Sequence, residues 1–191
     1  MIKIINEKLP LHNFHITSSS NIYIVDYKDY NGGEVTLEDS KPEDIKFVHL
    51  TNEFEVEIVF DGFKENALPL EAGNHNSQCE CLLFPSSCNE SDWILFIETK
   101  YANDLKAAFN ENYDYPNCML RQIQETVSYF RDKEIIPKKK RVHAIVSFPN
   151  LIEEFSGFFA KDKIEGLLYE HQILLRPVNR GRIKSVKRIY L

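Results

Sequence analysis

The sequence predicts a mixed α/β domain in which helices flank a mixed central sheet. Short apolar segments separated by turn residues fill the first hundred residues, which is typical of strands. A long amphipathic segment follows at 114–133, and an apolar segment of strand length returns at 141–148. Neighbouring strands followed by a helix and a returning strand indicate one mixed sheet covered by helices.

Size and composition fit a domain that needs no disulfide or metal to hold its core. The chain has 191 residues, of which 43% are hydrophobic and 27% are charged, an ordinary balance for a globular protein. Its apolar runs are far shorter than a bilayer requires, and the first ten residues lack the apolar stretch of a signal peptide. We therefore expect a cytoplasmic protein without contact to a membrane.

The four cysteines are expected to be free thiols, as is usual in a reducing compartment. Their spacing does not form the paired knuckles of a structural zinc site. Cys79 and Cys81 stand two residues apart, so within one strand they would share a face as core residues.

Residues 1–53 predict a β-rich extension packed on a core that comprises residues 54–191. Residues 21–28 indicate a first strand, and the Asn-Gly-Gly turn that follows leads into a second strand from Glu34. A short helix is expected to start within residues 40–43.

The core opens with three strands. Apolar residues alternate with glutamates over 54–60, which indicates a half-buried strand. Residues 78–84 form the next strand. Residues 92–100 are the most apolar segment of the chain, and this predicts a central strand covered on both faces.

Helical segments dominate the second half of the core. Residues 102–110 predict a short helix, and 114–133 a longer one with a single apolar side suited to packing on a sheet. Residues 141–148 predict a strand, a mostly helical stretch reaches about His171, and 173–191 is expected to be extended.

Charged side chains stand at the end of the most apolar strand. Because residues two apart share a face of a strand, Glu98 and Lys100 project together while Thr99 points away. Glu80 lies in the preceding strand among apolar neighbours, where an unpaired carboxylate is costly to bury. If the two strands are neighbours, the carboxylates of Glu80 and Glu98 point at one spot.

Two carboxylates that converge in this way offer the oxygen ligands preferred by Mg²⁺ or Mn²⁺. Such an ion would bind a phosphate oxygen and lower the pKa of its bound water. Lys100 would orient that water or balance the charge that develops on the phosphate.

This arrangement resembles the PD-(D/E)xK, or restriction-endonuclease-like, nuclease superfamily over residues 54–148. Members place an acidic residue on one core strand and Glu-x-Lys on the next, followed by a helix and a strand. Glu80 stands where the family usually has Asp, and Glu98 and Lys100 match the second half of the motif.

The resemblance implies a restriction-endonuclease-like core and Mg²⁺-dependent hydrolysis of phosphodiester bonds, in DNA more than in RNA. Many such nucleases act as dimers, so a homodimer is expected. The implied metal ligands are Glu80, Glu98 and the backbone carbonyl of Thr99. Some members also use a glutamine on the following helix, for which Gln122 and Gln124 are candidates and Gln122 is favoured.

Two basic runs are candidate contacts to nucleic-acid phosphates. The net charge of −6 conceals them, because the first hundred residues carry 18 acidic and 7 basic side chains and the rest carry 11 and 16. Binding depends on the local field and not on this sum. The residues are Lys138, Lys139, Lys140, Arg141, Arg176, Arg180, Arg182 and Lys184.

The sequence leaves several functions open. The first is a metal-dependent nuclease, and the second is a catalytically inactive relative that binds nucleic acid or a partner protein, suggested by Glu80 in place of Asp. The third is a protein-interaction module that uses the first fifty residues. In the non-functional alternative, Glu98 and Lys100 form only a surface ion pair, worth about 0–1 kcal/mol.

Overall fold

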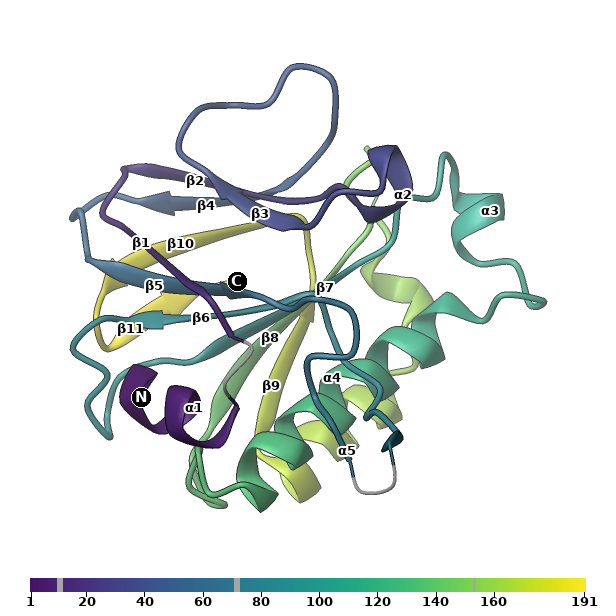
Figure 1. The fold of residues 1–191 in the computed structure, drawn as a ribbon. Helices are drawn as coiled ribbons and strands as arrows, with labels where there is room; N and C mark the ends of the chain where they lie inside the picture. The colour runs from purple at the N-terminus through teal and green to yellow at the C-terminus, as the bar shows by residue number, and fades with distance from the viewer. Residues whose placement is uncertain (10–11, 71–72, 153) are drawn as a thin grey trace.

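Two mixed sheets lie face to face, and helices cover the outer face of one of them (Figure 1). The computed structural model describes residues 1–9, 12–70, 73–152 and 154–191. Its elements in chain order are α1 (Ile2–Lys8), β1 (Phe14–Thr17), β2 (Asn21–Asp26), α2 (Lys28–Asn31), β3 (Val35–Glu38), β4 (Val48–Asn52), β5 (Ile58–Gly62), β6 (Cys81–Pro85), β7 (Leu95–Thr99), α3 (Leu105–Ala108), α4 (Tyr115–Asp132), β8 (Val142–Ser147), the 3₁₀ helix η2 (Ser156–Phe158), α5 (Lys161–His171), β9 (Ile173–Pro177), β10 (Arg180–Ser185) and β11 (Arg188–Tyr190).

The first sheet has six strands in the order β1-β5-β6-β7-β8-β9. The pairs from β1 to β7 are antiparallel, and β7, β8 and β9 run parallel. Every residue of β7 is buried, so the expectation of a mixed sheet with a central strand covered on both faces is confirmed. The parallel register pairs Leu95 with His143 and Thr99 with Ser147, which puts the carboxyl ends of β7 and β8 at one edge.

The second sheet has five strands in the order β11-β10-β4-β2-β3. The strands within residues 1–53 are divided between the sheets, since β2, β3 and β4 share this sheet with the C-terminal strands β10 and β11, while β1 joins the first sheet. Alternate residues of β2 and β4 are buried between the two sheets, as the period of two of a strand requires. These buried side chains explain why the sheets pack face to face. These inward residues are Ile22, Ile24, Val48 and Leu50.

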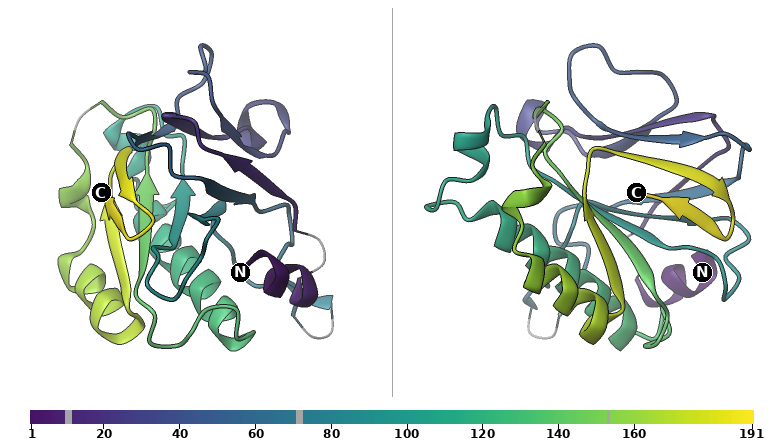
Figure 2. Two further views of the ribbon diagram at one scale, coloured as in Figure 1. Left: turned by 90° about the vertical axis from the view of Figure 1, so that its left-hand side faces the viewer. Right: turned by 180° about the vertical axis from the view of Figure 1, so that it is seen from behind.

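Helices α4 and α5 lie side by side on the outer face of the first sheet (Figures 1 and 2). The apolar side predicted for the long helix is the side that α4 buries there, and its core residues are Met119, Leu120, Ile123, Val127 and Phe130. Among the residues that the structure describes, no helix combines the length and the apolar content needed to cross a bilayer.

Three local predictions are wrong. Residues 40–43 form bends and not the start of a helix. Phe54 is 65% exposed in a turn, and the strand begins at Ile58 with consecutive buried residues, because both sheet faces are covered there. The helix expected over 102–110 is limited to Leu105–Ala108.

The four cysteines are free thiols, as predicted, but Cys79 and Cys81 do not share a face. Cys79 belongs to the cluster under the helices, whereas Cys81 lies between the two sheets. The physical reason is that the chain bends at Glu80 and β6 starts only at Cys81. This bend sets the position of the Glu80 side chain.

Candidate functional site

Two acidic residues meet where β6 and β7 pair. Cys81 lies opposite Ile97 in the antiparallel register, and the Glu80 N–H donates a hydrogen bond to the Ile97 carbonyl at 2.9 Å. Glu80 therefore lies next to Glu98 across the strand pair.

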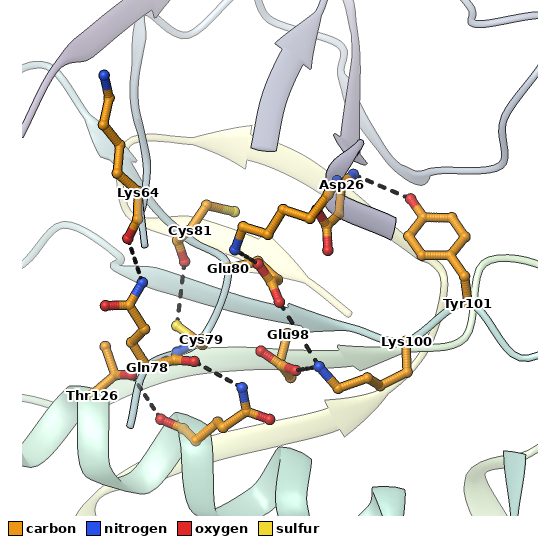
Figure 3. Close-up of polar contacts among 12 residues, drawn as sticks. Asp26, Lys64, Gln78, Cys79, Glu80, Cys81, Glu98, Lys100, Tyr101 and Thr126 are labelled. Atoms are coloured by element: carbon orange, nitrogen blue, oxygen red, sulfur yellow. Dashed lines mark hydrogen bonds and ion pairs between the residues drawn. The ribbon is translucent and has the colours of Figure 1, made fainter. Parts of the chain in front are cut away.

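Lys100 joins the two carboxylates. Its Nζ lies 2.7 Å from Glu98 Oε1 and 3.9 Å from Glu80 Oε1, and Figure 3 shows the ammonium group reaching both. The backbone holds Lys100 in place, since its N–H donates to the Ser147 carbonyl at 3.0 Å. The structure thus brings together the three side chains that the strand periodicity selected.

Burial makes this acidic pair unusual. Glu98 is 0% exposed and Glu80 is 5% exposed. Burial, reinforced by the charge of Glu80, raises the pKa of Glu98 to about 8, although Lys100 opposes the shift. Glu98 Oε2 accepts no hydrogen bond from any residue that the structure describes. A fully buried carboxylate oxygen without a donor is an open position for a cation or a water.

Further members of the site, which the sequence did not reveal, come from the end of β2, the start of α2 and the residue after Lys100. The Lys28 ammonium forms an ion pair with Glu80 Oε2. Asp26, at the end of β2, is buried, and its carboxylate accepts the Lys28 N–H at 2.9 Å. The Asp26 N–H in turn donates to the Tyr101 hydroxyl at 3.2 Å. Of these three residues, only Tyr101 could have been selected as a candidate from the sequence, because it directly follows Lys100.

Helix α4 fixes the segment that precedes Glu80. Thr126 Oγ1 accepts the Cys79 N–H at 2.9 Å, and the Gln122 side-chain amide donates to the Gln78 carbonyl at 2.8 Å. Gln122 therefore positions the chain beside Glu80, whereas Gln124 contacts His171 on α5.

A groove of about 840 Å³ leads from solvent to Glu80. Gln122 lines it from α4 and Lys28 from the start of α2, while Lys64 lies on its wall. Glu98 lies behind Glu80 and does not line the groove. A small anion that enters would meet Glu80 and Lys28 first.

The predicted basic residues fall into separate places. Residues 138–141 precede β8, so they lie at the end of the sheet opposite to Glu98 and Lys100. Lys140 is used locally, since its ammonium donates to the carbonyls of Glu90 and Asp92. Because residues 138–141 and the acidic pair lie at opposite ends of the sheet, they do not form one continuous binding surface for nucleic acid.

The C-terminal basic residues also differ from one another. Arg182 and Lys184 form ion pairs with Glu53, and Arg176 is exposed on β9. Arg180 follows Asn179, whose side-chain Oδ1 accepts a hydrogen bond from Ser147 Oγ at 2.6 Å. It therefore lies at the same end of the sheet as the acidic pair.

Metal binding here would depend on few protein ligands. Within the described ranges, no group of three or more His, Cys, Asp or Glu side chains is arranged to hold an ion. Glu80 and Glu98 are the acidic pair available, and Thr99, whose carbonyl was the third predicted ligand, ends β7 beside them.

The fold and the site define a mixed α/β protein with a buried acidic pair held by lysines. Comparisons with models of protein families, with curated proteins and with solved structures found no match. The geometry of this site is therefore the basis for the function proposed below.

Proposed function

We propose that this protein is a metal-dependent nuclease that hydrolyses phosphodiester bonds in nucleic acid, with DNA as the favoured substrate. One observation carries the proposal: buried carboxylates from adjacent strands lie within 4.0 Å of the same ammonium group, that of Lys100. The arrangement is the one that the resemblance to the PD-(D/E)xK superfamily implies, with Glu80 and Glu98 as the acidic pair.

The residues present suit Mg²⁺ or Mn²⁺. Mg²⁺ is usually bound by one or two carboxylates, with waters and substrate phosphates completing the octahedron. Glu80 and Glu98 supply two carboxylates, and the free Oε2 of Glu98 is an acceptor without a donor among the described residues. The Thr99 carbonyl is the proposed third ligand.

A divalent ion held there supplies Lewis acidity and a bound water of lowered pKa. Lys100 would donate a hydrogen bond to the phosphate or to the attacking water, and Glu98 fixes the direction of its ammonium at 2.7 Å. Glu98 is fully buried and the Lys100 side chain is 25% exposed, and this partial removal from water strengthens the attraction between Lys100 and developing negative charge. Gln122 would keep Glu80 in place through its hydrogen bond to the Gln78 carbonyl.

A catalytically inactive nucleic-acid-binding protein is the second candidate. The observation that favours it is the charge balance of the site, in which Lys28 pairs with Glu80 and Lys100 pairs with Glu98. Two ammonium groups thus balance the charge of both carboxyl groups when these are ionised, without an added ion.

Cleavage of DNA in the presence of Mg²⁺ or Mn²⁺ tests the proposal. Lys100→Ala should lower the rate by about 10²–10³-fold, the usual effect of removing one preorganised donor. Lys106→Ala, at an exposed lysine of the nearby helix α3, is the matched control and should cleave like the wild type. Circular dichroism confirms that each variant is folded.

Calorimetry with Mn²⁺ separates the two candidates. The nuclease proposal expects binding heat for the wild type and its loss in Glu98→Ala. Absence of heat and of cleavage in the wild type supports the inactive candidate. Equal cleavage by wild type and Lys100→Ala identifies a contaminating nuclease and removes the support for the proposal.

A further inference from the structure

On the second sheet, two aromatic side chains and one arginine form a row across neighbouring strands. In the register, Tyr23 of β2 lies opposite His49 of β4, and His49 lies opposite Arg180 of β10. The rings of Tyr23 and His49 stack with a centroid separation of 4.9 Å and an interplanar angle of 9°. Phe47 meets Tyr23 edge-on at 4.8 Å. Tyr23 and His49 thus turn one ring face toward each other and leave the second face of each ring for other contacts, and this group of three rings is here called the aromatic platform.

The platform lies on the outer face of this sheet. Its neighbours along the strands, Ile24, Val48 and Leu50, are buried between the sheets, so Tyr23 and His49 point the other way. The long helices α4 and α5 lie across the first sheet, away from this face (Figures 1 and 2). Each of the three rings is only partly buried, so ring surface remains open to a ligand.

A hollow of about 740 Å³ adjoins the three rings. Three basic side chains line it, those of Lys41, Lys46 and Arg180, and the carboxylate among the described lining residues is that of Glu154. Lys41, Lys46 and Arg180 are exposed, and none of them takes part in an ion pair with a described residue. Rings beside unpaired cations are the combination that single-stranded nucleic acids require.

The charge state of His49 supports stacking. Burial lowers the pKa of His49, and the positive charges of Arg180 and Lys41 lower it further. The imidazole is therefore neutral at pH 7 and offers a flat uncharged ring next to Tyr23. Arg180 lies opposite His49 in the strand register, and Lys41 lines the same hollow, so both can reach a phosphate bound beside the rings.

The platform adjoins the acidic site. Tyr101, which follows Lys100, donates a hydrogen bond to the Lys46 carbonyl at 2.9 Å. Asp26 lies three residues beyond Tyr23 on β2, a distance of about 10 Å at the usual rise of a strand. Strand alternation turns Tyr23 to the outer face of this sheet and the buried Asp26 to its inner face, so the platform and the acidic site lie on opposite sides of the sheet and adjoin at its edge.

We propose that the aromatic platform binds single-stranded nucleic acid, with bases stacked on Tyr23, Phe47 and His49 and phosphates paired with Lys41, Lys46 and Arg180. This binding needs no metal and does not depend on hydrolysis.

The experiment is fluorescence anisotropy with a labelled oligo-dT in EDTA, where no divalent ion supports cleavage. Tyr23→Ala should weaken binding by about fivefold to a hundredfold, since one stacked base is worth about 1–3 kcal/mol. Tyr23→Phe should keep the affinity, because stacking needs the ring and not the hydroxyl. Tyr169→Ala, at a side chain 74% exposed on α5, is the matched control and should bind like the wild type.

Arg180→Ala gives an independent readout, because Arg180 is exposed and its loss is not expected to affect folding. The slope of log affinity against log salt should fall by about 0.7 for one lost phosphate contact. An oligo-U arm distinguishes RNA from DNA, and a blunt duplex should bind more weakly than either single strand.

Three outcomes overturn the proposal: no binding of any single strand at low salt, equal binding of the blunt duplex, or unchanged affinity in Tyr23→Ala and Arg180→Ala alike. Lys100→Ala separates this proposal from the nuclease function, since it should bind oligo-dT normally while losing cleavage. Binding without cleavage in the wild type contradicts only the nuclease function.

Discussion

Glu98 shows why this site is more than a surface ion pair. Its side chain is 0% exposed, so the alternative of a solvated pair with Lys100 is wrong. Burying a carboxylate is costly unless it is paired, and removing one partner of a buried pair typically costs about 3–5 kcal/mol. Ion binding is the reason that we propose for two acidic residues in such a place.

The raised pKa of Glu98 gives the first prediction: apparent affinity for Mn²⁺ should increase as the pH rises from about 6 to about 8. Because the pKa of Glu98 is about 8 before the ion binds, the carboxyl group holds a proton below that pH and must lose it to the solvent before its carboxylate can bind the ion. Each pH unit below 8 should therefore weaken binding by up to about tenfold. Burial also raises the pKa of Glu80, so its effect has the same sign.

Calorimetry in two buffers of different ionisation enthalpy checks this prediction, because the difference in heat counts the protons released. Carboxylates with ordinary pKa values would already be ionised at pH 6. A flat affinity between pH 6 and pH 8, with no proton release, would contradict the prediction.

At this scale the sequence allowed part of the site to be predicted. Strand alternation and apolar context were sufficient to select Glu80, Glu98 and Lys100. Lys28 contacts Glu80 from 52 residues away in the chain and from the start of helix α2. No local pattern encodes such a contact, so Lys28 and Asp26 could not be found without the tertiary structure.

At the scale of elements, the connection from β2 to α2 brings a positive charge into the site. Asp26 fixes the Lys28 backbone through its N–H, and the Lys28 ammonium reaches Glu80. The ammonium group of Lys28 therefore already pairs with Glu80 before any metal ion binds. A divalent ion that binds Glu80 must compete with Lys28 or displace it toward the groove.

Lys28→Met should therefore bind Mn²⁺ more tightly than the wild type, by a few-fold to about tenfold, or about 1.4 kcal/mol at most. The physical reason is that removing one ammonium leaves two carboxylates with Lys100 alone, so the site attracts a cation more strongly. Calorimetric titration at one pH and one ionic strength measures the change.

Lys64→Met is the matched control, because Lys64 lines the same groove but pairs with Glu34 at 3.2 Å. It should leave the Mn²⁺ affinity nearly unchanged. Equal or weaker binding by Lys28→Met would show that Lys28 does not compete for the ion.

The prediction of elements succeeded where a single pattern dominated. The long apolar side of α4 and the apolar run of β7 each determine their element, and both were predicted. The alternation at 54–60 misled, because it includes turn residues, whereas the strand Ile58–Gly62 is buried nearly throughout. A strand that is covered on both faces buries consecutive residues, so its sequence lacks the alternation of apolar and polar residues that a half-exposed strand shows.

At the scale of the whole molecule, the two ends of the chain complete each other's sheets. β10 pairs with β4 in parallel, while β1 pairs with β5. A boundary at residue 53 therefore does not divide the protein into units that could fold separately. No composition shift or linker could reveal this sharing, because it depends on pairing between strands far apart in sequence.

Trp93 provides a probe of this interleaved arrangement. It is the one tryptophan of the chain and is 3% exposed. Its indole N–H donates to the Ser185 carbonyl at 2.9 Å, and its backbone N–H donates to the Val186 carbonyl at 3.2 Å. Its fluorescence thus reports the contact between the first sheet and the C-terminal end of β10.

We expect urea unfolding followed by Trp93 fluorescence and by far-ultraviolet circular dichroism to give coincident transitions, as for one cooperative unit. Ile183→Ala sharpens the test, because Ile183 lies on β10 and is fully buried between the sheets. Its loss should destabilise the fold by about 2–5 kcal/mol and move both transitions together. If the second sheet unfolded by itself, the variant would shift the fluorescence transition and leave most of the circular dichroism in place. The acidic site draws Lys28 from helix α2, which follows β2 of the second sheet, and Glu98 from the first sheet, so such separate unfolding would also disconnect the site from its second cation.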